Sequence, residues 1–225
     1  MLCWNAMNYL AHGWRFANQP CFLAGTAVPD WLSVIDRKMR ARGKTAALFV
    51  DDADENLAAL ARGIVQHHRD DEWFHQTTAF NELSLAFTMQ IREVLPADDG
   101  FRPSFLGHIL VELLLDATLT EEEPARLDRY YVALAQADPA FLQAAINRLS
   151  TRQSDKVAYL VTRFLQERFL YDYAEDGKLL VRLNHVMRRV GLPQLPPELA
   201  ELFPEMRATI RSRRHELLPE HKSQL

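Results

Sequence analysis

Residues 103–119, PSFLGHILVELLLDATL, form the most apolar stretch of the chain. Apolar residues occupy nearly every side of the helix that this pattern predicts, which is typical of a central, buried helix. His108, Glu112 and Asp116 follow one another at four-residue steps, so they line one face of that helix. Such a chain has to pack other helices around this segment and satisfy a buried polar stripe.

Helical periodicity also recurs in the rest of the chain. Glycine is scarce, with 8 residues, and no stretch alternates with a strand's period of two. Pro29 predicts a break, because proline does not fit inside a helix. The expected helices cover about 4–16, 31–42, 54–76, 78–95, 103–119, 122–136, 139–150, 154–173, 177–190 and 196–219. We therefore predict an all-α chain, a single-domain helical bundle of about ten helices over residues 1–225.

Composition excludes several classes of protein. Hydrophobic residues make up 48% and charged residues 25% of the chain, which argues against disorder. A net charge of −4 gives no general attraction to nucleic acid or to an anionic membrane, so neither is an expected partner. No uninterrupted apolar run reaches the roughly 18 residues of a membrane-spanning helix. Two cysteines, Cys3 and Cys21, are too few for a disulfide framework, which predicts a cytoplasmic protein.

A second triplet with the same spacing lies in GIVQHHRDDEWFH: His67, Asp71 and His75. Each four-residue step advances about 6 Å along a helix and turns it by about 40°, so these side chains also share a face. Imidazoles and carboxylates that converge from facing helices form metal sites in helical proteins. The alternative for this hydrophilic segment is a polar surface stripe. For the buried triplet, the alternative to a cation is a salt bridge to an arginine.

Two arrangements of metal are consistent with the triplets. Their outer members lie about 12 Å apart along the helix, so one ion cannot bind all six side chains. Two ions bridged by Asp71 are one possibility, and one ion with a spare histidine as acid or base is the other. Asp71, His75 and His108 are accordingly the candidate catalytic residues. The mixture of donors suits a divalent ion of zinc, manganese or iron.

Two further polar residues lie near predicted helix ends. His12 follows Leu10 and Ala11 on an apolar first helix, where a histidine is either a core residue or a ligand. Asp30 follows Pro29, and it either caps a helix that begins at Trp31 or faces a metal.

Four segments, MNYLAH, LAGTAVPDW, GIVQHHRDD and VELLLDATL, resemble the successive blocks of the acyl-carrier-protein phosphodiesterases. These enzymes are similar to the HD-type, all-α metal phosphohydrolases, so the resemblance implies an HD-domain-like fold. LVRLNHVMRRV and ELFPEM also look similar, so the resemblance spans most of the chain. The positions that match polar positions of the family, and so would be metal ligands, are His12, Asp30, His67, Asp71, Glu112 and Asp116.

The chain departs from this family at three points. Ala117 stands where the family has a histidine after its last aspartate, and His75 stands where it usually has an aspartate. His108 is a possible substitute for the missing histidine. The His-Asp dipeptide that names the HD group is absent, since His68 is followed by Arg69. These departures leave the metal framework in place and put the substrate in doubt.

The resemblance implies hydrolysis of the phosphodiester between phosphopantetheine and a serine of an acyl carrier protein. Carrier proteins are acidic, so a basic docking surface is expected. Its candidates are two segments, Arg37, Lys38, Arg40, Arg42 and Lys44, and Arg207, Arg211, Arg213 and Arg214, each of which is otherwise a solvated helix face. Arg188 and Arg189 are candidates to bind a substrate phosphate.

Two other hypotheses remain. In the first, the chain is a non-catalytic helical scaffold or binding protein of the same fold, and Ala117 and His75 are the residues that favour it. A ferritin-like di-iron protein is less consistent, because that class expects Glu-x-x-His pairs, which the triplets lack.

Overall fold

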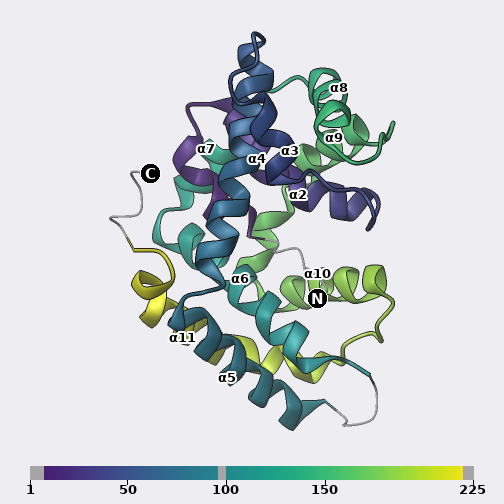
Figure 1. Ribbon diagram of the computed structural model, residues 1–225. Coiled ribbons are helices and arrows are strands. Elements are labelled where there is room, and N and C mark those ends of the chain that lie inside the picture. The colour runs from purple at the N-terminus through teal and green to yellow at the C-terminus, as the bar shows by residue number, and fades with distance from the viewer. Residues whose placement is uncertain (1–7, 96–99, 220–225) are drawn as a thin grey trace. The chain divides into compact units, whose positions relative to one another are not determined.

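The computed structural model describes residues 8–95 and 100–219, and every regular element within them is a helix (Figure 1). The predicted all-α class is confirmed. The first residues of the expected helix 4–16, and Cys3, lie outside the described residues. The chain divides into two compact units, residues 8–72 with 124–169, and residues 73–95, 100–123 and 170–219. A single domain over 1–225 stays a prediction, as does the likeness to an HD domain.

The first unit contains α1 (Tyr9–Gly13), η1 (Trp14–Phe16), α2 (Pro20–Ile35), α3 (Gly43–Ala46), η2 (Ala47–Phe49), most of α4 (Glu55–Phe74), α7 (Pro124–Leu134), α8 (Pro139–Leu149) and α9 (Val157–Glu167). The second contains α5 (Thr78–Val94), α6 (Pro103–Glu122), most of η3 (Phe169–Ala174), α10 (Asp176–Val190), η4 (Pro197–Leu202) and α11 (Phe203–Leu217). The helix expected over 154–173 is interrupted at Arg168, which adopts a left-handed backbone conformation.

Helix α2 corrects the predicted break at Pro29. The proline lies inside the helix, which runs from Pro20 to Ile35, and no helix covers 36–42. A proline inside a helix costs about 3 kcal/mol, because its nitrogen donates no hydrogen bond. All ten residues 23–32 are buried, so the apolar area that the continuous helix removes from water offsets this cost. Asp30 is therefore an interior residue of α2, and its interpretation as a cap was wrong.

Two glycines bring α2 and α4 into backbone contact. A Cβ atom added at Gly63 would lie 2.1 Å from the carbonyl oxygen of Phe22 and 2.9 Å from the Cα of Gly25. One added at Gly25 would lie 2.3 Å from the carbonyl oxygen of Leu60. No side chain fits between the helices at this crossing. Because His67 follows Gly63 by about one helical turn, the crossing also sets how closely His67 approaches α2.

A third glycine has the same role in the second unit, where α5, α6 and α11 pack together (Figure 1). A Cβ atom at Gly107 of α6 would lie 2.6 Å from the carbonyl oxygen of Ser84 and 2.9 Å from the backbone nitrogen of Thr88, both on α5. His108, the next residue, is thereby held close to the N-terminal half of α5.

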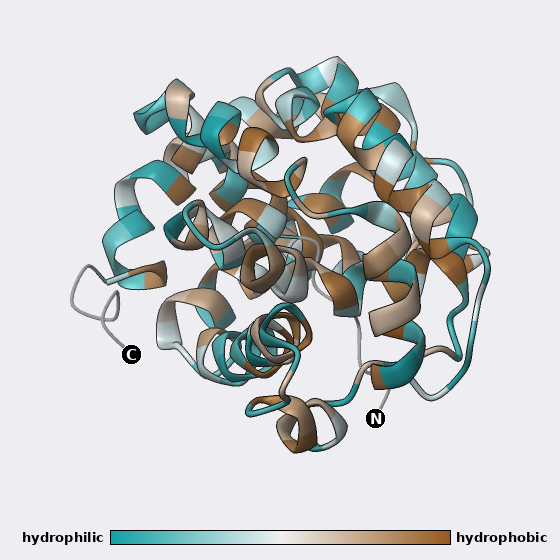
Figure 2. Cartoon of the chain, turned by 90° about the horizontal axis from the view of Figure 1, so that it is seen from above, coloured by the Kyte–Doolittle hydropathy of each residue, from teal (hydrophilic) through white to brown (hydrophobic). Residues whose placement is uncertain are grey.

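Helix α6 (Pro103–Glu122) is the buried helix that its sequence predicts. It is long and apolar enough by composition to cross a membrane, yet 83% of its most apolar window is buried within the protein. Most of its apolar surface is therefore covered within the described structure. Along many of the other helices, hydrophobic and hydrophilic residues alternate in bands, as amphipathic packing requires (Figure 2).

Candidate metal centres

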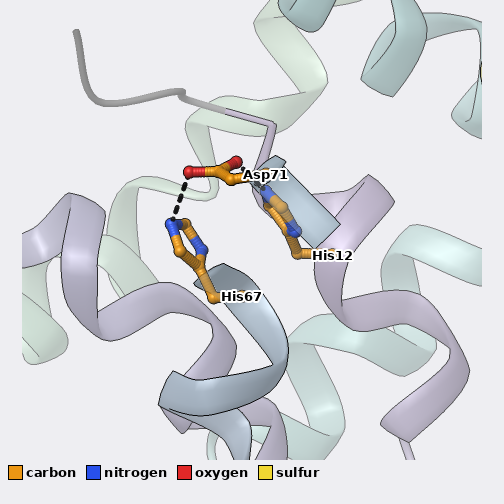
Figure 3. Close-up of side chains that lie close together, drawn as sticks. All are labelled: His12, His67 and Asp71. Carbon is orange, nitrogen blue, oxygen red and sulfur yellow. Dashed lines mark ion pairs between the residues drawn. The ribbon is translucent and has the colours of Figure 1, made fainter. Parts of the chain in front are cut away.

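The first candidate metal centre consists of His12, His67 and Asp71, all in the first unit (Figure 3). His12 Nε2 lies 3.2 Å from Asp71 Oδ1, and His67 Nε2 lies 3.3 Å from Asp71 Oδ2. The two imidazole rings are tilted against each other with centroids 4.4 Å apart. One nitrogen from each ring and the carboxylate thus converge within 4.8 Å of one another.

The other nitrogen of each ring has a partner of its own. His67 Nδ1 lies 2.8 Å from the carbonyl oxygen of Thr26, and because a carbonyl only accepts, the Nδ1–H donates. His12 Nδ1 lies 3.4 Å from Oδ2 of Asp70, which Gln66 holds by a second hydrogen bond. Such outer partners orient metal-binding histidines and leave Nε2 for the ion.

The electrostatics of this centre indicate a site for positive charge. Burial lowers the pKa of His12, but the hydrogen bonds and charges of Asp70 and Asp71 outweigh it and hold the pKa well above its ordinary value. Burial raises the pKa of Asp71, and the neighbouring His67 and His12 more than reverse this, so its pKa lies far below the ordinary range. Asp71 is ionised, and either imidazolium protons or a metal ion compensate its charge.

The donor set fits a divalent transition metal. Two imidazole nitrogens and a carboxylate are borderline donors that zinc, iron and manganese accept, and three protein ligands leave a coordination position open. The side chains of His12 and His67 are almost fully enclosed, whereas 22% of the Asp71 side chain is exposed. Asp71 is therefore the least enclosed member of the centre, although its Oδ1 atom is buried.

The second candidate metal centre consists of His75, His108 and Glu112, all in the second unit. Both histidines direct Nε2 at the same oxygen, Glu112 Oε1, at 3.0 Å and 3.1 Å. The ring of Phe80 packs against both imidazoles, with centroids 4.8 Å away in each case. Burial raises the pKa of Glu112, but its contacts with His108 and His75 outweigh burial and lower it.

The grouping of residues differs from the two predicted helical triplets. Helix α4 ends at Phe74, so His75 lies in the turn that follows and does not continue the face of His67 and Asp71. His75 instead meets His108 and Glu112, so side chains from both predicted segments do converge there. The expected pair of ions bridged by Asp71 stays a prediction, as do the catalytic roles of Asp71, His75 and His108.

Two predicted ligands belong to neither group found among the described residues. Asp30 is fully buried in α2, and Asp116 is buried in α6, where its backbone carbonyl accepts a hydrogen bond from Thr120. Their roles as ligands stay predictions.

Residues that the sequence did not single out support both centres. In the first centre, Asp70 and the Thr26 carbonyl anchor the two imidazoles. In the second centre, Phe80 packs against His75, and the Asn81 amide donates to the His75 carbonyl at 3.0 Å. Of these supporting residues, only Asp70 could have been suspected from the sequence, because it adjoins Asp71 in HHRDD.

The turn that holds His75 ends in a helix cap. Thr77 is the N-cap of α5, its Oγ1 accepting from the backbone nitrogen of Phe80 and donating to the carbonyl of Phe74 at 2.8 Å. We expect Thr77→Ala to lower the free energy of unfolding by about 1 kcal/mol, because the cap is lost. Urea denaturation followed by circular dichroism measures this loss. Thr78→Ala, at an exposed neighbour, is the control, and an equal loss in both variants would contradict the cap.

The two basic segments have different surroundings. In the segment near the C-terminus each arginine is paired with a carboxylate: Arg207 with Asp176, Arg211 with Glu121, Arg213 with Glu216 and Glu82, and Arg214 with Glu122. Those carboxylates reduce the net positive charge of the segment. In the other segment Arg37, Lys38, Arg42 and Lys44 are exposed, and Arg40 is half-buried. On α10, Arg188 is exposed and Arg189 half-buried, and phosphate binding by either stays a prediction.

Comparison of the chain with protein-family models, with curated proteins and with solved structures found no match.

Proposed function

We propose that the chain is a metal-dependent phosphohydrolase whose reaction takes place at the first centre. The observation that carries the proposal is the orientation of His67: its Nδ1–H is committed to the Thr26 carbonyl, so Nε2 faces the carboxylate of Asp71. A neutral imidazole in this tautomer would direct a lone pair at an anion, an unfavourable contact that a cation between them turns into coordination.

The protein side of the centre has two tasks, to hold the ion and to orient its ligands. His12, His67 and Asp71 would hold a zinc, manganese or iron ion, and Asp70 keeps the His12 ring in place from the opposite side. When bound, such an ion lowers the pKa of a water molecule and compensates charge on phosphoryl oxygens. The exposed part of Asp71 marks the side from which a substrate would approach.

His68 does not take part in this arrangement. Its Nε2 donates to the carbonyl oxygen of Ala41 at 2.7 Å, and burial lowers its pKa, so it is neutral at pH 7. Its bond instead fixes α4 to the segment that precedes α3.

The substrate class comes from the sequence rather than from the geometry. The resemblance to acyl-carrier-protein phosphodiesterases suggests a phosphodiester, and an acidic carrier protein would find the exposed cations of residues 37–44 in the same unit as the centre. We therefore propose a phosphodiester as the substrate, with the phosphopantetheine linkage of an acyl carrier protein as the particular case, and the cytoplasm as the location.

A non-catalytic scaffold is the second candidate. The observation in its favour is that Asp71 is already paired with two histidines, which would satisfy its buried charge without any ion if the rings are protonated. On this view the centre stabilises the crossing of α1, α2 and α4.

Removal and return of metal separates these two candidates. We expect protein purified without added metal to contain a transition metal and to hydrolyse a chromogenic phosphodiester. Dialysis against a chelator should abolish turnover, and zinc, manganese or iron(II) should restore it. Mass spectrometry of a carrier protein before and after incubation tests the narrower substrate. Full activity in metal-free protein would exclude the phosphohydrolase mechanism, and no activity with any metal would favour the scaffold.

A further inference from the structure

We infer that His75, His108 and Glu112 form a separate binding site for a divalent transition metal, which joins the turn before α5 to α6. This site lies wholly within the second unit, and the inference does not depend on phosphoester hydrolysis at the first centre. It predicts that the chain still binds one ion after the first centre has been removed by mutation.

Three ligand atoms meet at one point of the second unit. Nε2 of His75 and Nε2 of His108 lie 3.0 Å and 3.1 Å from the same carboxylate oxygen of Glu112, and all three atoms lie within 4.8 Å of one another. The two imidazole rings are inclined by only 35° with centroids 4.8 Å apart. They therefore lie on the same side of the Glu112 oxygen. Two nitrogens and one oxygen are a donor set that zinc and neighbouring divalent metals accept.

The charge at this point favours a cation. Glu112 has no exposed side-chain surface and belongs to the most apolar helix of the chain. Neutral imidazoles can donate hydrogen bonds to its oxygen, but they add no positive charge to a carboxylate enclosed in a low-dielectric environment. A divalent ion would add that charge and replace the two histidine–carboxylate contacts with coordination bonds.

The two centres differ in which of their side chains are exposed to solvent. In the second centre the carboxylate is enclosed, and 27% of the His75 side chain and 23% of the His108 side chain are exposed. An ion can therefore enter past the imidazoles, which are soft enough to select a transition metal over magnesium or calcium. In the first centre the carboxylate is the exposed member.

The ligands are held in place before any ion arrives. Phe80 packs against both rings, and the Asn81 amide donates to the carbonyl oxygens of His75 and Thr77 at 3.0 Å and 2.8 Å. Gly107 keeps α5 close to α6 beside His108. Because an ion would bind both the turn and α6 in the folded protein, it would stabilise the folded state by preferential binding.

Zinc stoichiometry tests the second site. Metal-free protein is titrated with zinc in competition with a chromophoric chelator, for the wild type and for His67→Ala, His75→Ala and the double variant. We expect two ions for the wild type, one for each single variant and none for the double variant. Cobalt(II) as a probe should give a visible absorption band in His67→Ala that disappears in the double variant. His215→Ala, at an exposed histidine of α11, is the control and should keep both ions.

Each outcome is decisive for the second site. If His67→Ala binds no ion, or if His75→Ala keeps the stoichiometry of the wild type, the site does not exist as inferred. If the first site alone fails, the wild type and His67→Ala both bind one ion, and His75→Ala binds none. His75 lies in a turn and is partly exposed, so its variant should fold, and far-ultraviolet circular dichroism checks this. His108→Gln repeats the test at the second imidazole.

Discussion

Gly63→Ala is expected to lower the free energy of unfolding by about 3 kcal/mol, although alanine is the better helix former. The new methyl group would lie 2.1 Å from the carbonyl oxygen of Phe22 and 2.9 Å from the Cα of Gly25, and both are backbone atoms that cannot rotate away. Helices α2 and α4 would have to separate, and the hydrogen bond from His67 to Thr26 would lengthen. Urea denaturation measures the first effect, and zinc affinity of the first centre measures the second.

The matched control is Gly177→Ala in the first turn of α10. A Cβ atom at Gly177 meets nothing within 4 Å, so there the substitution should raise stability by up to about 1 kcal/mol. The two variants make the same chemical change in a helix and should differ in the sign of their effect. A neutral or stabilising Gly63→Ala would show that α2 and α4 do not cross as closely as described.

Asp71→Asn is expected to reduce phosphodiester turnover by about three orders of magnitude, because the first centre loses its only charged ligand. A metal ion contributes several kilocalories per mole to such a reaction, and about 1.4 kcal/mol corresponds to a factor of ten. The amide keeps the size of the side chain, so the helical spectrum should not change. Turnover is measured at saturating zinc or manganese, and the number of bound ions is measured in parallel.

Variants of the two residues adjacent to Asp71 serve as comparisons for this result. Asp70→Asn removes the partner of His12 Nδ1 and should cost about 10- to 100-fold in metal affinity, the usual effect of an outer partner. Glu72→Gln removes an exposed charge next in the sequence and should have no effect. Equal losses in Asp70→Asn and Asp71→Asn would indicate a general effect of charge on this part of α4. An active Asp71→Asn would end the proposal for the first centre.

Much of the fold could be predicted from the sequence, because helical periodicity depends on local spacing. The burial of residues 103–119 followed from their apolar composition, and α6 occupies almost the same range. Pro29 led to a wrong helix boundary. Local rules give a proline its intrinsic cost, whereas the burial of residues 23–32 is a tertiary effect that those rules do not contain.

The candidate sites could be predicted only in part. Spacing identified His67, Asp71, His108 and Glu112, but the way they are grouped depends on a helix end and on helix crossings. Helix α4 ends one residue before His75, which separates it from His67 and Asp71. The Thr26 carbonyl could not be found in this way, because every residue has a backbone oxygen and only the Gly25–Gly63 crossing brings this one to His67.

The crossing of α2 and α4 also restricts insertions and deletions in the chain. Gly63 and His67 have to face the same neighbour, and they do so because a step of four residues is little more than one helical turn. One residue inserted between them would rotate the imidazole by about 100° away from Thr26. Relatives of this protein should therefore conserve the number of residues between the two positions more strictly than their identity.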